Sequence, residues 1–198
     1  MKKLILIGSA SLLLAACVDT TGLTATLTHQ PHPKSNPNGA VIVSEFADLQ
    51  CPACRTAHET ILKPILEKYG SQIRYEFHHF PLRSIHRYAI DAAEAAECAG
   101  DQGKFWEFVD LDYTQQDKLT KSMLSTWAER LKLNMDPFSR CVKSHIKRDA
   151  ILEEFAAGQK AGVSGTPTFF VGGTRVESSA AAIGAAIEEK IKGAEMRL

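Results

Sequence analysis

The chain has 198 residues, of which 44% are hydrophobic and 23% are charged, and its 23 Lys and Arg residues balance its 23 Asp and Glu residues. This length and composition predict one globular domain rather than a disordered chain or a repeat array. A net charge of zero argues against nucleic acid as a partner, because nucleic-acid-binding domains carry a basic surface.

The first sixteen residues predict an export signal, because two lysines precede an apolar run that is too short to span a bilayer comfortably. The run ends in Leu-Ala-Ala-Cys at residues 14–17, which resembles the lipobox of bacterial lipoproteins. The resemblance implies that Cys17 is lipidated and that the protein is anchored to a membrane of the bacterial cell envelope, on its periplasmic side. In a Gram-negative host, Val18 favours the outer membrane, since an aspartate at this position commonly retains lipoproteins on the inner one. The alternative is an ordinary secretory signal in which Cys17 is incidental.

Residues 17–39 predict a flexible tether between lipid and domain, because Thr, Pro and Asn prevail and no apolar periodicity is present. The folded domain is expected over residues 40–198. Its first third predicts a strand at residues 41–46, a helix from residue 51 to 69 that bends at Pro64, and a second strand at residues 73–77.

From about residue 84 to 161 the pattern is helical, with an alanine-rich helix, a helix carrying Trp127 on its apolar face, and a helix capped by Asp136. Without an internal repeat or a second tether, this segment predicts an insertion into the domain. A two-strand hairpin turning at Gly172 and Gly173 follows, and isoleucines at every fourth position predict a final helix that packs on the sheet.

Two groups of polar residues are expected to be structural. His78 and His79 follow the second strand and predict surface or packing positions rather than ligands. Lys143, Lys147 and Arg148 predict a solvated helix face.

Cys51 and Cys54 stand where the first strand is followed by a helix. A thiolate at a helix N-terminus faces unpaired N–H groups and the positive end of the helix dipole, so its pKa falls and it becomes a usable nucleophile. Cys51, at the exposed end, is the expected attacker, and Cys54 the resolving thiol. The alternatives are a structural bridge and a zinc site, but Cys98 and Cys141 are too far apart in sequence to form a closely spaced zinc-binding pair.

The ordered set of Glu45, the two cysteines, a helical insertion, and Thr166 with Pro167 resembles the DsbA-like branch of the thioredoxin superfamily. The resemblance covers roughly residues 40–192 and implies an α/β, thioredoxin-like fold with a helical insertion. It implies that Pro167 is a cis-proline lying against the cysteines, where neighbouring backbone groups pair with a substrate peptide. It also implies that Glu45 is a buried acid that assists proton transfer at the inner cysteine. The alternatives are a trans proline that opens a strand and a carboxylate facing solvent.

The remaining cysteines and the residues between the active cysteines leave two questions open. With Cys17 lipidated and Cys51 paired to Cys54, a structural disulfide between Cys98 and Cys141 is the remaining intramolecular pairing. Two buried free thiols or a second redox pair are the alternatives. The Pro-Ala dipeptide at 52–53 departs from the Pro-His of the best-known strong oxidants, so the oxidising strength is left open.

Together these features predict an exported, lipid-anchored, monomeric thiol:disulfide oxidoreductase that forms disulfides in unfolded or thiol-bearing exported proteins by exchange at Cys51. The resemblance implies reoxidation by a quinone-coupled membrane protein, and it implies no flavin, nicotinamide or metal. The nearest alternative is a reductase or isomerase. An alternative of another class is a non-enzymatic envelope lipoprotein that uses the fold for binding, with Cys51 and Cys54 as a structural bridge.

Overall fold

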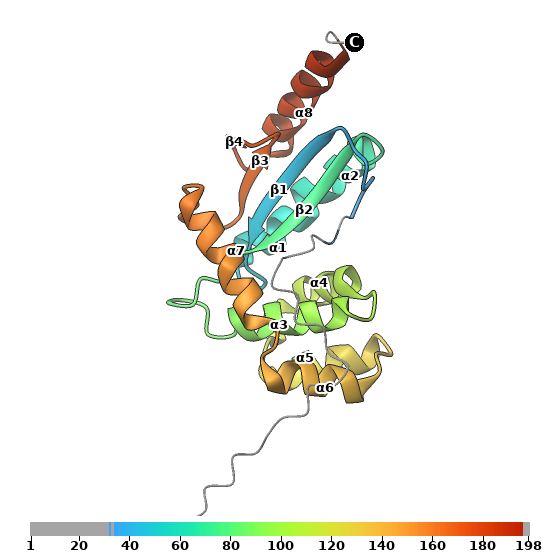
Figure 1. Cartoon of the computed structure of the whole chain (residues 1–198), viewed down its shortest axis with the longest axis vertical. Helices are drawn as coiled ribbons and strands as arrows, with labels where there is room; N and C mark the ends of the chain where they lie inside the picture. Colours follow the sequence, from blue (N-terminus) through green and yellow to red (C-terminus); the bar gives the residue numbers. More distant parts are fainter. Residues whose placement is uncertain (1–31, 33, 196–198) are drawn as a thin grey trace, which may run out of the picture.

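The computed structural model describes residue 32 and residues 34–195, so the predicted signal, Cys17 and most of the predicted tether lie outside the described residues. A four-stranded sheet in the order β2-β1-β3-β4 lies beside a group of helices (Figure 1). The first two strands are parallel, as a helical crossover between them requires, and the other neighbours are antiparallel. The strands are β1 (Val41–Ala47), β2 (Ile73–His79), β3 (Thr168–Val171) and β4 (Thr174–Val176).

The crossover between β1 and β2 is a continuous helical segment with one wide turn. It consists of α1 (Pro52–Ala57), the π-helical η1 (His58–Leu62) and α2 (Lys63–Tyr69). Pro64 lies in the first turn of α2, where its missing N–H and its ring disturb the hydrogen bonding of the preceding turn. The sequence predicts a bend at this proline, and the structure places the π-helical turn directly before it.

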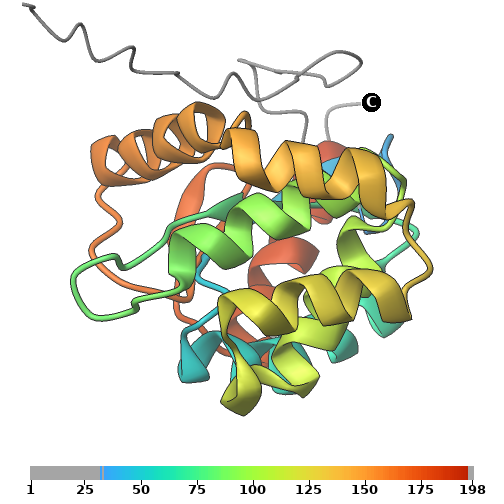
Figure 2. The ribbon, with the colours of Figure 1, turned by 90° about the horizontal axis from the view of Figure 1, so that it is seen from below.

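The helical insertion lies between β2 and β3, as predicted. In the view from below, α3 lies at the centre of the group and contacts the helices around it (Figure 2). The predicted cap Asp136 is wrong, because the side chain of Asn134 accepts the backbone N–H of Asp136 and therefore caps that helix. The elements are α3 (Ala89–Gly100), α4 (Phe105–Thr114), the 3₁₀ turn η2 (Gln116–Lys118), α5 (Lys121–Arg130), α6 (Met135–Ser144) and α7 (Arg148–Lys160).

One hydrophobic core joins the sheet to the insertion. Alanines of α3 are fully buried and allow the neighbouring helices to approach closely, while Phe77 of β2 packs against Phe105 of α4. Trp127 of α5 is also fully buried, as predicted. A disulfide between Cys98 of α3 and Cys141 of α6 ties two of these helices together, with a Cα–Cα distance of 5.9 Å.

The C-terminal elements complete the sheet and contact it. Gly172 and Gly173 form the turn between β3 and β4 with positive φ angles of 53° and 77°, which glycine adopts without strain. The final helix α8 (Ala180–Glu195) contacts β1, β3 and β4 and buries Ile183 and Ile187. The predicted hairpin and final helix are therefore confirmed.

The folded domain begins before the predicted boundary at residue 40. The Ser35 hydroxyl donates to the Ile73 carbonyl at 2.9 Å and accepts the Tyr75 N–H at 2.8 Å, while Lys34 pairs with Asp110 at 2.7 Å. Residues 34–39 are therefore bound to the domain. The sequence predicts a tether here because these residues are polar and have no apolar periodicity. Their contacts are hydrogen bonds and an ion pair with residues distant in sequence, which no local pattern indicates.

The predicted solvated basic face is partly wrong. Lys147 is 5% exposed and pairs with Asp101 at 2.6 Å, and Arg148 pairs with the buried carboxylate of Glu94 at 3.0 Å. These pairs form where the start of α7 meets α3, and no local sequence pattern reveals this contact.

Candidate active site

Cys51 and Cys54 lie at the start of α1, directly beyond the end of β1. Cys51 is the N-cap of the helix and Pro52 follows in the first turn, where the missing N–H costs no hydrogen bond. Cys51 keeps 6% of its surface exposed and Cys54 keeps none, and both are free thiols. A reacting sulfur from another molecule can therefore approach Cys51 and not Cys54.

The two thiols differ strongly in acidity. A hydrogen bond from the Cys54 side chain, helped by Thr166 and by backbone N–H groups of Ala53 and Cys54, lowers the pKa of Cys51 to about 5 against the opposing effect of burial. Burial raises the pKa of Cys54 well above its usual value, and the bond to Cys51 and the nearby charge of Glu45 act in the same direction. At neutral pH the reduced pair therefore holds a single thiolate, on Cys51.

This asymmetry predicts a pH profile for alkylation of Cys51. In the reduced protein, the rate of reaction with iodoacetamide is expected to rise with a midpoint near pH 5, read by mass analysis of the peptide that contains Cys51. Cys54→Ala removes the hydrogen-bond donor and is expected to raise the midpoint, whereas Cys54→Ser keeps a donor and is the matched control. A wild-type midpoint near 9, the usual cysteine value, would contradict this account of the site.

Glu45 lies on β1 and is 3% exposed, so it does not face solvent. Burial raises its pKa to about 7, against the hydrogen bond that it accepts from the Tyr75 hydroxyl. A carboxyl group that titrates near neutral pH can both hold and release a proton. Its electrostatic effect on the pKa of Cys54 places this carboxyl group near the inner thiol.

Thr166 and Pro167 lie against Cys51 although 115 residues separate Thr166 from it in the chain. The peptide bond between Thr166 and Pro167 is cis, and the Thr166 carbonyl oxygen is 3.6 Å from the Cys51 sulfur. The structure thus brings Thr166 and Pro167 to the cysteine pair, with Glu45 buried behind it. The disulfide of Cys98 and Cys141 lies in the helical insertion and is not part of this site.

Asp48 supports the loop before Cys51 and was missed in the sequence. Its carboxylate accepts the backbone N–H groups of Gln50 and Leu82, both at 2.8 Å, and lies 2.7 Å from the ring of His86. Its backbone carbonyl accepts the Cys51 N–H, and its own N–H lies 3.5 Å from the Cys54 sulfur. Aspartate favours turns because its carboxylate can accept the backbone N–H two residues on, so an aspartate between a predicted strand and a predicted helix is the signal that could have identified it.

Gln116 is the second supporting residue that the sequence did not reveal. Its side-chain amide donates to the carbonyls of Leu49 and Cys51 at 2.7 and 3.1 Å, which ties the insertion to the active loop. No local signal marks such a residue, because its partners lie 65 or more positions away. Within residues 32 and 34–195, no group of three or more His, Cys, Asp or Glu side chains is placed to hold a metal ion.

Comparison with known proteins gives a family and a fold. A family model described as Thioredoxin matches residues 30–189. Among solved structures, α-DsbA1 of Wolbachia pipientis has a TM-score of 0.71 at 22% identity, covering 86% of this chain and 96% of that one. BdbD of Bacillus subtilis, in its oxidised form, has a TM-score of 0.72 at 19% identity, covering 83% and 97%. Both show that the fold is similar to that of the DsbA-like proteins.

Curated relatives that match this chain carry the name of a sodium/proton antiporter. A segment of 144 residues is 42% identical to part of "Na(+)/H(+) antiporter NhaA 3" of Salinispora tropica, and covers 73% of this chain but 22% of the antiporter. A match to "Na(+)/H(+) antiporter NhaA 1" of Salinispora arenicola is 39% identical over 168 residues and covers 84% and 26%. The chain therefore spans about a quarter of the length of these relatives.

Proposed function

The chain belongs to the thioredoxin family, and on that premise we propose that it is a thiol:disulfide oxidoreductase that forms disulfides in thiol-bearing exported proteins by exchange at Cys51. The observation that carries the proposal is the asymmetric cysteine pair. Cys51 is slightly exposed and has a pKa lowered to about 5, while Cys54 is buried with a pKa well above its usual value. A purely structural disulfide does not require its two sulfurs to differ in exposure and in pKa.

The exchange starts from the oxidised pair. A substrate thiolate attacks the Cys51 sulfur, the Cys51–Cys54 bond breaks, and Cys54 leaves and takes up a proton, for which Glu45 is the nearby store. A second substrate thiolate then attacks its partner sulfur in the mixed disulfide, closes the substrate bridge and releases Cys51 as a thiolate. The substrate loses two electrons and the cysteine pair gains them.

The acidity of Cys51 favours this direction over reduction. A thiol of low pKa is a good leaving group, and a stabilised thiolate lowers the free energy of the reduced enzyme, so electrons flow toward it. Ala53, where the best-known strong oxidants carry histidine, leaves a reductase or isomerase as the second candidate.

Equilibration of the protein with graded glutathione buffers tests the proposal. We expect the Cys51–Cys54 pair to equilibrate with a potential toward the oxidising end of the range of about −270 to −120 mV spanned by thioredoxin and DsbA. The same oxidised protein is expected to form the disulfide of a two-cysteine peptide stoichiometrically. A value near the thioredoxin end would favour a reductase. A pair that never exchanges would favour a structural bridge and a binding lipoprotein.

The cellular setting is part of the proposal. Residues 1–16 would act as a signal peptide and Cys17 as the lipidated residue that holds a monomeric domain on the envelope, with a quinone-coupled membrane protein as its reoxidant. In the part of the chain that the structure describes, no helix combines the length and apolar character required to cross a bilayer. Mass analysis of Cys17 for a diacylglyceryl group tests the anchor.

A further inference from the structure

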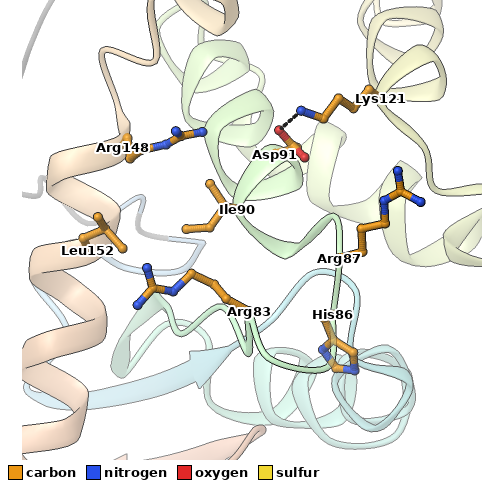
Figure 3. Close-up of a pocket in the computed structure, with 8 residues that line it drawn as sticks. All are labelled: Arg83, His86, Arg87, Ile90, Asp91, Lys121, Arg148 and Leu152. Atoms are coloured by element: carbon orange, nitrogen blue, oxygen red, sulfur yellow. Dashed lines mark ion pairs between the residues drawn. The ribbon is translucent and has the colours of Figure 1, made fainter.

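The loop between β2 and α3 borders a pocket that the cysteine chemistry does not use. The pocket has a volume of about 340 Å³, and its side chains come from this loop and from α3, α5 and α7 (Figure 3). Basic groups prevail among them, and Ile90 and Leu152 add apolar surface. We call residues 82–88, which include Arg83 and Arg87, the arginine loop.

Three basic groups at the pocket already have acidic partners. Lys121 pairs with Asp91 at 2.9 Å, as the dashed line in Figure 3 shows. Arg148 pairs with Glu94, and His86 lies 2.7 Å from the carboxylate of Asp48. These contacts largely neutralise that part of the pocket.

Arg83 and Arg87 differ from these groups, because neither guanidinium has an ion pair among the described residues. Arg83 lies over the ring of Phe155 at 5.4 Å, and Arg87 over that of Tyr88 at 5.3 Å. Stacking leaves the N–H edge of a guanidinium open to a carboxylate, which it can bind with two parallel hydrogen bonds. Two open donor groups therefore lie on one short loop.

Ile85 stands between the two arginines and is 71% exposed. No other large hydrophobic side chain is exposed among residues 32 and 34–195. The loop therefore presents an apolar side chain together with two cations that have no ion pair among the described residues, and arginine is enriched among the residues that dominate binding at protein interfaces.

The arginine loop is bonded directly to the residues that precede Cys51. Leu82 N–H and the His86 ring both contact the Asp48 carboxylate, and Tyr88 N–H donates to the Gln50 side chain at 2.6 Å. A peptide bound on the loop would therefore lie beside residues 48–50, which lead from β1 to the reactive Cys51.

We propose that the arginine loop docks the segment of a protein substrate that flanks its reactive cysteine, and that it selects segments carrying acidic side chains next to an apolar one. The proposal rests on the proposed function, whose substrate class it specifies. Carboxylates match the open edges of Arg83 and Arg87, and an apolar side chain matches Ile85 and the surface of Ile90.

The test compares two peptides, each with two cysteines and a leucine, that differ in carrying glutamates or glutamines beside one cysteine. The rate constant for oxidation by the oxidised protein is divided by the rate with oxidised glutathione, which corrects for intrinsic thiol reactivity. The wild type is expected to prefer the glutamate peptide by about tenfold at low salt, and the preference is expected to shrink at high salt.

The double variant R83Q/R87Q is expected to lose this preference while its rate with the glutamine peptide stays unchanged. R130Q/K132Q is the matched control, because it also removes two positive charges, from exposed positions at and just after the end of α5, and it is expected to keep the preference. Ile85→Ser is expected to slow both peptides equally. Equal rates for the two peptides in the wild type, or a preference that survives R83Q/R87Q, would overturn the proposal.

Binding of serine-substituted peptides separates this proposal from the proposed function. Calorimetry with the glutamate peptide in which both cysteines are replaced by serine is expected to detect binding by the wild type and none by R83Q/R87Q. Binding without exchange in the thiol peptides would overturn the oxidoreductase alone. Exchange without binding or preference would overturn the docking site alone.

Discussion

Cys51→Ser is expected to abolish disulfide exchange, lowering the rate with a two-cysteine peptide by roughly 10³-fold or more, because a hydroxyl is neither a nucleophile nor a leaving group at neutral pH. Cys51 is the sulfur with both access and a pKa lowered to about 5, so Cys54 cannot replace it. Single-turnover mixing of protein and fluorescent peptide measures the loss. Exchange that survives in Cys51→Ser would show that another sulfur is attacked.

Cys54→Ser provides the complementary result. The reduced variant keeps the Cys51 thiolate and is expected to accumulate a mixed disulfide with a disulfide-bearing peptide, because no inner thiol is present to resolve it. Mass analysis under acid quench identifies the adduct on Cys51. If both single variants retain the wild-type structure and neither forms an adduct, the pair is a structural bridge.

Removal of the disulfide in C98A/C141A is expected to lower the free energy of unfolding by about 2–4 kcal/mol. The two cysteines are 43 positions apart, and a closed loop of this size restricts the unfolded chain by about 4 kcal/mol, less any relaxation in the folded state. Urea unfolding of wild type and variant, both with Cys51 and Cys54 reduced, measures the difference.

The same variant distinguishes the alternatives for these cysteines. Its exchange rate at Cys51 is expected to match the wild type under native conditions, because the disulfide joins α3 to α6 and does not contact the cysteine pair. If the urea midpoint and the exchange rate are both unchanged in the variant, the wild-type thiols are free in solution. If the urea midpoint is unchanged but the exchange at Cys51 is lost, Cys98 and Cys141 form a second redox pair.

Local patterns in the sequence were sufficient to predict much of the fold. The strand before Cys51, the helix after it, the glycine hairpin and the final amphipathic helix each follow from neighbouring residues, because their periodicity and turn chemistry are local. The placement of Thr166 and Pro167 against Cys51 is a contact between distant segments, and it could be predicted because the ordered motifs resemble a known family.

The contacts of Gln116 with the active loop and the ion pair of Glu94 within the insertion could not be predicted in the same way. Their partners are distant in sequence, and nothing in the residues around Gln116 and Glu94 marks these contacts. Asp136 and Asn134 show a second limit, since both are good cap residues and the backbone conformation of Asn134 decides between them.

The contacts of Ser35 along β2 have a consequence for aggregation. β2 is an edge strand of the sheet, and the outward backbone groups of such a strand attract strands from other chains. Ser35 occupies the Ile73 carbonyl and the Tyr75 N–H, and Glu154 accepts the N–H of His79 at the other end of the strand. At the opposite edge, β4 has three residues, and so short an edge strand offers few backbone groups to a strand of another chain. Both edges of the sheet thus leave few backbone groups open to pair with the unfolded substrate chains that we propose this protein binds.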